Sequence, residues 1–242
     1  NQNRNPNSNS PTNLSTDAYG FAAADYDSDG RVDLMVASNG DPNTLVRNIN
    51  DSNPLALQWD DGSNGETRDV AWADFDGDGL LDLVLITGGS EDRVLLQTPD
   101  GSAPFEEAWQ SVAAEEGYGV AAGDLDGDGD VDFVVANAGN TSSHVYLNDG
   151  LADFQLAFTF GPGDDTRDVE LGDWDGDGDL DVVAGNHGQQ DKVWAWGLDA
   201  QGDPELTLLH STAAALDTVD VALGDPDGDG DLDVAACHEG TL

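Results

Sequence analysis

The chain has 242 residues, with 7 Lys and Arg against 50 Asp and Glu, so its formal net charge is −43 at pH 7. This balance argues against nucleic acid and membrane insertion, because phosphate and anionic lipid surfaces need a basic face and no apolar run is long enough to span a bilayer. A hydrophobic fraction of 38% with six Trp still allows a sizeable core, so the charge does not indicate disorder.

Residues 1–17 form a polar segment rich in Asn, Ser and Pro. Such a composition has low strand propensity and no apolar alternation. We expect this segment to be disordered in isolation and to pack against a neighbouring chain or domain.

A nine-residue pattern of the form Asp-x-Asp-x-Asp-Gly-x-x-Asp then occurs five times, with starts 49, 50, 49 and 52 residues apart. The five copies occupy residues 25–33, 74–82, 124–132, 173–181 and 225–233. Matches at a near-constant period indicate an array of repeated structural units.

Short apolar runs flank each copy and predict strands rather than helices, because they hold about four residues and are bounded by Gly and Asp. In the second repeat the predicted strands are Val70–Ala73, Leu83–Ile86, Arg93–Gln97 and Phe105–Ser111. Gly-containing turns are expected after the second strand, for example at Gly88-Gly89 and His187-Gly188.

Four antiparallel strands in each repeat of about 50 residues predict an all-β fold, a β-propeller whose last blade is incomplete. A parallel β-helix is less suitable, because its coils are much shorter. The propeller would cover residues 18–242, with blades at about 18–66, 67–116, 117–165, 166–217 and, in part, 218–242.

A weaker similarity links alternate repeats. Thr67-Arg68-Asp69-Val70 returns as Thr166-Arg167-Asp168-Val169, and Ala18-Tyr19-Gly20 resembles Gly117-Tyr118-Gly119. This echo suggests either duplication of a blade pair or a surface feature shared by alternate blades.

Each acidic loop predicts a calcium site, so we expect about five Ca²⁺ ions. Calcium takes six to eight hard oxygen ligands, and carboxylates at loop positions 1, 3, 5 and 9 with the carbonyl of position 7 would supply them. The predicted ligands are Asp25, Asp27, Asp29, Arg31 and Asp33; Asp74, Asp76, Asp78, Leu80 and Asp82; Asp124, Asp126, Asp128, Asp130 and Asp132; Asp173, Asp175, Asp177, Asp179 and Asp181; and Asp225, Asp227, Asp229, Asp231 and Asp233.

An EF-hand, a magnesium site and a metal-free turn fit the loops less well than calcium does. An EF-hand needs Glu at position 12, where this chain has Val36, Leu85, Val135, Ala184 and Ala236. Magnesium prefers fewer protein ligands and more water. A solvated turn that binds nothing would leave four carboxylates to repel one another in each loop.

The loops with their flanking strands resemble the FG-GAP/VCBS repeat family, which includes the β-propeller of integrin α-subunits, over about residues 18–242. The resemblance implies a calcium-stabilised propeller, usually extracellular and used for adhesion or ligand binding. It also implies that calcium lies in the hairpin between the first and second strands of a blade.

Several further candidate sites are less specific than the loops. The four His show no zinc spacing and are expected to be ordinary surface or loop residues, and the single Cys237 allows no intrachain disulfide. Trp194 and Trp196 share one strand face, where they would either pack between blades or stack on a sugar. Paired Asp residues could serve a glycosidase, but the Asp residues of the loops are already explained as metal ligands.

We therefore expect a non-enzymatic, extracellular or cell-surface module that binds protein or glycan, or further copies of itself. A structural subunit of a surface layer or filament is the alternative, and a lectin or the scaffold of an enzyme is another.

The fifth repeat has room for its first two strands only, and residues 1–17 could lend at most one more. We expect that this chain does not form a sealed ring by itself. Either a longer protein with roughly six to eight blades, or another chain or copy, would complete it.

Overall fold

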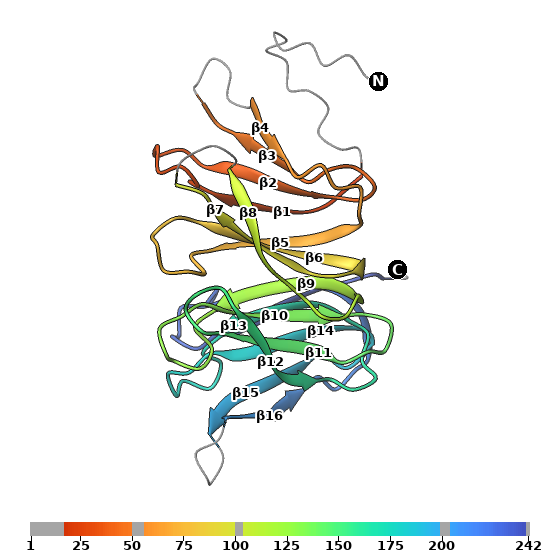
Figure 1. The fold of residues 1–242 in the computed structure, drawn as a ribbon. Coiled ribbons are helices and arrows are strands. Elements are labelled where there is room, and N and C mark those ends of the chain that lie inside the picture. Colours follow the sequence, from red (N-terminus) through yellow and green to blue (C-terminus); the bar gives the residue numbers. More distant parts are fainter. Residues whose placement is uncertain (1–16, 50–55, 100–103, 199–203, 241–242) are drawn as a thin grey trace.

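The computed structural model describes residues 17–49, 56–99, 104–198 and 204–240 (Figure 1). In these ranges the regular structure consists of eighteen β-strands, and none of the chain described forms a helix that could cross a membrane. The expected role of residues 1–17 lies outside the described residues, apart from Asp17.

The strands form four units of four strands and a fifth unit of two, in chain order. Unit 1 holds β1 (Ala18–Ala24), β2 (Asp33–Ser38), β3 (Thr44–Arg47) and β4 (Ala56–Asp60). Unit 2 holds β5 (Thr67–Ala73), β6 (Asp82–Ser90), β7 (Arg93–Gln97) and β8 (Phe105–Gln110). Unit 3 holds β9 (Glu115–Gly123), β10 (Asp132–Asn137), β11 (Ser143–Asn148) and β12 (Phe154–Phe160). Unit 4 holds β13 (Thr166–Gly172), β14 (Asp181–Gln189), β15 (Lys192–Leu198) and β16 (Pro204–Ser211), and unit 5 holds β17 (Leu216–Gly224) and β18 (Asp233–His238).

Consecutive strands within each unit pair antiparallel, as the sequence predicted, but two second strands continue into the next unit. The end of β6 pairs with β9, where Gly88 lies opposite Glu116, and the end of β14 pairs with β17, where His187 lies opposite Asp217. The predicted turns at Gly88-Gly89 and His187-Gly188 therefore lie inside strands. The expectation was wrong because these residues gain hydrogen-bonding partners from the neighbouring unit. For the same reason, β9 and β17 begin two residues before the expected blade starts.

The hydrophobic core lies between units rather than inside them. One cluster joins Met35 and Leu45 of unit 1 to Leu83 and Leu85 of unit 2, and further clusters join units 2 to 3, 3 to 4 and 4 to 5. A second strand such as Leu83–Ile86 is fully buried, because neighbouring units cover both of its faces. This burial explains why the second strands are continuous apolar runs.

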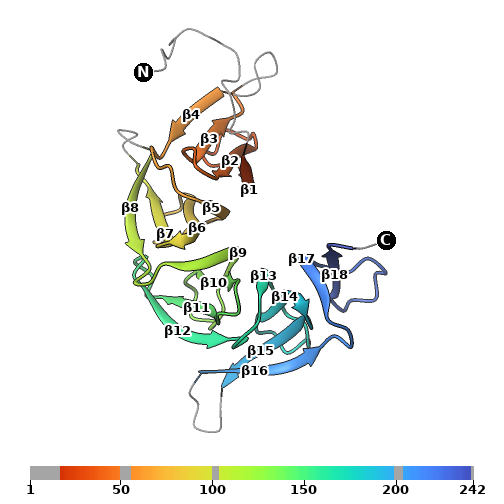
Figure 2. The same cartoon turned by 90° about the vertical axis from the view of Figure 1, so that its right-hand side faces the viewer.

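The units lie side by side around an arc, with the first strands on the inner side and the fourth strands on the outer side (Figure 2). Within the described residues β1 and β18 do not pair with each other, so the arc is open. The first strands of all five units therefore face a common interior, and the acidic loops follow directly from their ends.

Candidate metal centres

Each acidic loop joins the first strand of a unit to the second. The second loop residue anchors the loop on the core in the first three units, because Tyr26, Phe75 and Leu125 are 7%, 1% and 1% exposed. Trp174 is half-buried and Pro226 is exposed in units 4 and 5. The second residue therefore does not anchor the fifth loop, which fewer of the described strands surround.

The loops turn tightly because their acids accept hydrogen bonds from their own backbone. Asp74 accepts the amide protons of Asp78 at 3.1 Å and Gly79 at 2.9 Å. Gly77 and Gly79 adopt φ angles of 71° and 88°, which side chains disfavour. Ser28, which replaces this first Gly in loop 1, adopts the same left-handed conformation with φ 56°.

In every loop three carboxylates converge, with one oxygen from each within 4.8 Å of the others. Ligands on opposite sides of a calcium ion at about 2.3–2.6 Å would be about 4.6–5.2 Å apart, so this spacing suits one ion. The triads are Asp25, Asp27 and Asp29; Asp74, Asp76 and Asp78; Asp124, Asp126 and Asp132; Asp173, Asp175 and Asp181; and Asp225, Asp227 and Asp229.

Ten of the predicted ligands lie outside these triads and stay predictions. They are the acids Asp33, Asp82, Asp128, Asp177 and Asp233 and the position-7 carbonyl donors Arg31, Leu80, Asp130, Asp179 and Asp231.

The ninth loop residue has a second role that sequence reasoning missed. Asp132 is fully buried and accepts the amide protons of Leu125 at 2.8 Å and Asn148 at 2.9 Å, one on each carboxylate oxygen. Asp82 and Asp181 make equivalent pairs of bonds. This acid ties its loop to the third strand of the same unit, whether or not it also contacts an ion.

Some loop oxygens are buried without a hydrogen-bond partner among the described residues, namely Asp27 Oδ1, Asp33 Oδ2 and Asp124 Oδ1. A buried carboxylate oxygen without a partner is costly, so such atoms are rare in folded proteins. A hard cation would satisfy these oxygens, and the all-oxygen donor set suits calcium. The residues present therefore fit the predicted ion.

Burial raises the pKa of Asp82 and of Asp132 to about 6, although their backbone hydrogen bonds oppose the shift. The negative charges of other acids in the same loop, Asp76 and Asp126 among them, raise the pKa further. The loops thus concentrate negative charge in partly desolvated positions, where a bound cation would favour the ionised carboxylates.

A basic side chain stands beside the first loop. Arg47 lies within ion-pair distance of Asp27 and 3.0 Å from Asp29 Oδ2, so it contacts two acids of that triad. A comparison of the repeats could have found this residue, because Arg47 stands where units 2 and 3 have Leu96 and Leu147.

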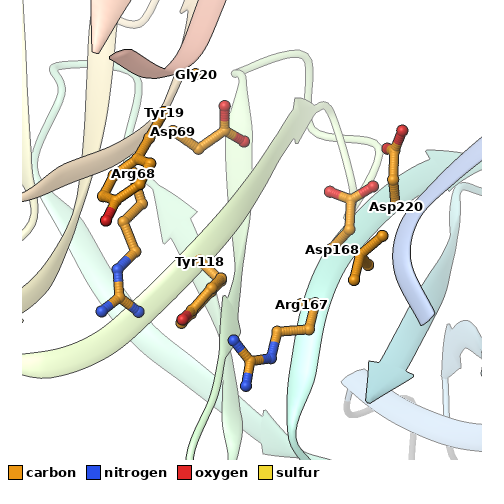
Figure 3. Close-up of a pocket in the computed structure, with 9 residues that line it drawn as sticks. Tyr19, Gly20, Arg68, Asp69, Tyr118, Arg167, Asp168 and Asp220 are labelled. Carbon is orange, nitrogen blue, oxygen red and sulfur yellow. The ribbon is translucent and has the colours of Figure 1, made fainter. Parts of the chain in front are cut away.

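The inner side of the arc holds a pocket of about 430 Å³ lined by residues from the first strands of all five units (Figure 3). Tyr118 lies between the guanidinium groups of Arg68 at 3.9 Å and Arg167 at 4.1 Å from its ring centre. Glu66 and Glu116 pair with Arg68, and Asp165 pairs with Arg167.

These contacts explain the similarity between alternate repeats. Asp69 accepts the amide proton of Val120 in the next unit at 3.0 Å, and Asp168 accepts that of Val221 at 2.9 Å. The Asp side chain of each repeated Thr-Arg-Asp-Val segment thus accepts a hydrogen bond from the first strand of the next unit. The feature shared by alternate units is one of packing between first strands.

The two Trp of β15 and one of the four His, the other candidates from the sequence, pack against other side chains. Trp196 is 4% exposed and packs on Phe158 with ring centres 5.3 Å apart, and Trp194 is part-buried beside Phe160. The expectation that all four His are surface or loop residues is wrong for His144, which is 8% exposed and lies 3.4 Å from Glu115. It lies on the same face of β11 as Tyr146, which packs in the cluster between units 2 and 3.

The FG-GAP-like repeat matches the chain at residues 25–85, 74–135, 124–184 and 173–236. The chain belongs to the FG-GAP-like repeat family. Each match starts at the first Asp of one loop and ends in the strand after the next loop, so four overlapping matches contain five loops.

Among solved structures, the chain is similar to the crystal structure of the V. cholerae biofilm matrix protein Bap1, with 19% identity and a TM-score of 0.57. The likeness covers 89% of this chain and 34% of Bap1, so the chain spans about a third of that protein, and it concerns the fold alone. No curated protein matches the sequence.

Proposed function

We propose that the chain is an extracellular, calcium-stabilised β-propeller module that serves in adhesion or ligand binding to protein or glycan. The convergence of three Asp carboxylates in each of five equivalent loops carries this proposal. Family membership supports it as well, because each matched range contains two of these loops.

In this proposal calcium offsets the repulsion between the loop carboxylates and contacts the buried oxygens that lack a hydrogen-bond partner. Every loop gathers at least four carboxylates at the end of a first strand, and their mutual repulsion opposes the turn. A bound ion would neutralise two charges and supply a partner for buried oxygens such as Asp124 Oδ1. Its role would be structural, so it would hold first and second strands together.

The propeller architecture is supported by burial at equivalent positions. Val70, Val120, Val169 and Val221 are 2–9% exposed where each first strand meets the preceding unit, whereas Phe21 in unit 1 is 72% exposed. Val32 in loop 1 is also 60% exposed. We propose that a further unit of the same kind covers this face and continues the arc toward a ring.

The extracellular adhesion role rests on two likenesses. The loops with their flanking strands resemble those of the FG-GAP/VCBS repeat family, for which adhesion or ligand binding is implied, and Bap1 is a biofilm matrix protein. We further propose a binding role rather than a catalytic one, because the acids that could form catalytic pairs hold loops or join units instead. Asp132 and Asp69 are examples.

Removal of calcium tests the proposal. Binding to the folded state alone stabilises a protein by about 2.7 kcal/mol per site at a hundredfold excess over Kd. Excess chelator should therefore lower the melting temperature by many degrees, and calcium should restore it where sodium chloride of equal ionic strength does not. An unchanged melting curve in chelator would refute the calcium sites.

A further inference from the structure

Loop 1 differs from the other loops in the residue that its third strand places beside it. Leu34 pairs with Val46, Leu83 with Leu95, Phe133 with Tyr146 and Val182 with Trp194. These registers make the next residues of the third strands equivalent, and they are Arg47, Leu96, Leu147 and Ala195. Unit 1 alone among the four described third strands carries a cation there.

The Arg47 guanidinium occupies the region where the loop 1 carboxylates converge. One of its terminal nitrogens, Nη2, contacts both Asp27 Oδ2 and Asp29 Oδ2, the latter at 3.0 Å. These acids are two of the three in the triad. Its side chain is 31% exposed, so the ion pairs are partly shielded from water.

A second guanidinium adds to this neutralisation. Arg31 Nη1 lies 3.1 Å from Asp29 Oδ2, although the Arg31 side chain is 43% exposed. Together the two side chains bring a formal charge of +2 to the loop, equal to that of one calcium ion. In loops 2 and 3 the third-strand residue at this position is apolar and brings none.

We propose that Arg47 is a built-in cation that takes the place of calcium in loop 1, so that the protein binds four calcium ions rather than five. The inference rests on the proposed calcium sites of the other loops. An ion that used Asp27 Oδ2 and Asp29 Oδ2 would have to displace Arg47 Nη2 from both oxygens. Arg47 is covalently tethered beside the loop, so it competes at a high effective concentration.

The loop keeps the remainder of a metal site. Asp27 Oδ1 and Asp33 Oδ2 stay buried without a hydrogen-bond partner in this part of the structure, even with Arg47 in position. Ser28 also keeps the left-handed turn that Gly adopts in the other loops. Removal of the guanidinium should therefore give a fifth functional site.

Calcium stoichiometry of the full chain, measured by equilibrium dialysis and by calorimetric titration, tests this inference. We expect four ions for the unmodified chain, five for Arg47→Leu and three for Leu96→Arg, which moves the guanidinium to loop 2. Arg93→Leu is the matched control, because Arg93 pairs with Asp61 rather than with a loop triad, and it should still bind four.

Other stoichiometries would contradict the role of Arg47 or the proposed function. Five ions on the unmodified chain, or four on Arg47→Leu, would overturn the role of Arg47 while leaving calcium binding intact. Binding of no calcium by any variant would overturn the proposed function itself. If Arg47→Leu does not fold, as judged by near-ultraviolet circular dichroism of the Trp residues, Arg47→Gln and Leu96→Arg carry the same test.

Discussion

At the scale of single residues, the same amino acid performs different tasks within nine positions. The first acids of each loop are exposed or half-buried. They accept hydrogen bonds from the backbone amides of the same loop. The ninth acid is fully buried in units 1 to 4 and joins the loop to the third strand. In unit 5 the equivalent Asp233 is exposed, because no third strand lies beside it in the described residues.

Because of this difference, substitutions of the two kinds of acid should change stability in different ways. Asp132→Ala should destabilise the protein with or without calcium, because it leaves the buried amides of Leu125 and Asn148 without acceptors, at about 1–3 kcal/mol each. Asp126→Ala should destabilise it only when calcium is present, because its carboxylate lies in the triad and its one backbone bond is exposed. Urea unfolding in calcium and in chelator distinguishes them, and equal losses for Asp126→Ala in both would contradict the prediction.

A second prediction at this scale concerns Asp92, whose pKa burial raises to about 7 against the opposing hydrogen bond from Thr87. The folded state holds this proton more tightly than the unfolded state, so stability falls as pH rises from about 4 through 7. Unit 1 has Asn43 at the equivalent place, where it accepts the Ser38 amide proton at 2.9 Å.

Asp92→Asn should therefore raise the free energy of unfolding at pH 8 by at least about 1 kcal/mol, since one pKa unit corresponds to about 1.4 kcal/mol. The gain should shrink as pH approaches 4. Thermal unfolding across this range measures it, and a gain that does not depend on pH would contradict the assignment.

At the scale of elements, units are joined in two ways. Units 2 and 3, and likewise 4 and 5, share a sheet because β6 and β14 extend to pair with the next first strand. Units 1 and 2 do not share a sheet; besides the core cluster between them, they meet through the contact between β1 and β5 and an isolated bridge between Asn39 and Glu66. First strands approach closely at every junction, and at two of them, β1 with β5 and β9 with β13, a Gly lies against an Asp of the next first strand.

Gly119 marks one of these close approaches, between β9 and β13. A Cβ atom there would lie 2.8 Å from Asp168 Oδ1 and 3.0 Å from Asp168 Cα, so the two units would have to separate. Gly119→Ala should cost about 1–3 kcal/mol. Gly197→Ala is the control, because a Cβ atom there meets nothing within 4 Å, and its stability should stay the same or rise. Equal effects in chemical denaturation would refute the close approach.

At the scale of the whole molecule, the described residues leave both ends of the arc exposed, and the end at unit 1 exposes a large aromatic side chain. Phe21 is 72% exposed there, while Phe133 in the cluster between units 2 and 3 is fully buried. Each of units 2 to 5 is covered on this side by the unit before it.

Phe133→Ala should cost about 3–5 kcal/mol, whereas Phe21→Ala should change stability by about 0.5 kcal/mol or less. Denaturant unfolding of the two variants measures the contrast. A large loss for Phe21→Ala would mean that the face is covered in solution. The same substitution in a chain extended by a further unit before β1 should cost more than in this chain.

The sequence by itself was sufficient for the repeat, the positions of most strands and the convergence of acids in the loops. These features depend on short-range effects: Gly adopts the left-handed turn, Asp binds amides a few residues away, and apolar runs pair with their neighbours in sequence. The triads accordingly formed among residues that the spacing had selected, such as Asp74, Asp76 and Asp78.

Only the tertiary structure decided what depends on the placement of one unit against another. It decided that Gly88 and His187 continue a strand, that His144 is buried and that Asp69 reaches Val120 across a junction. Within unit 1, the pairing of β2 with β3 also brought Arg47 to a loop that ends fourteen residues earlier in the chain. Periodicity within one repeat carries no information about these contacts, because they arise from register and side-chain reach between strands that are distant in sequence.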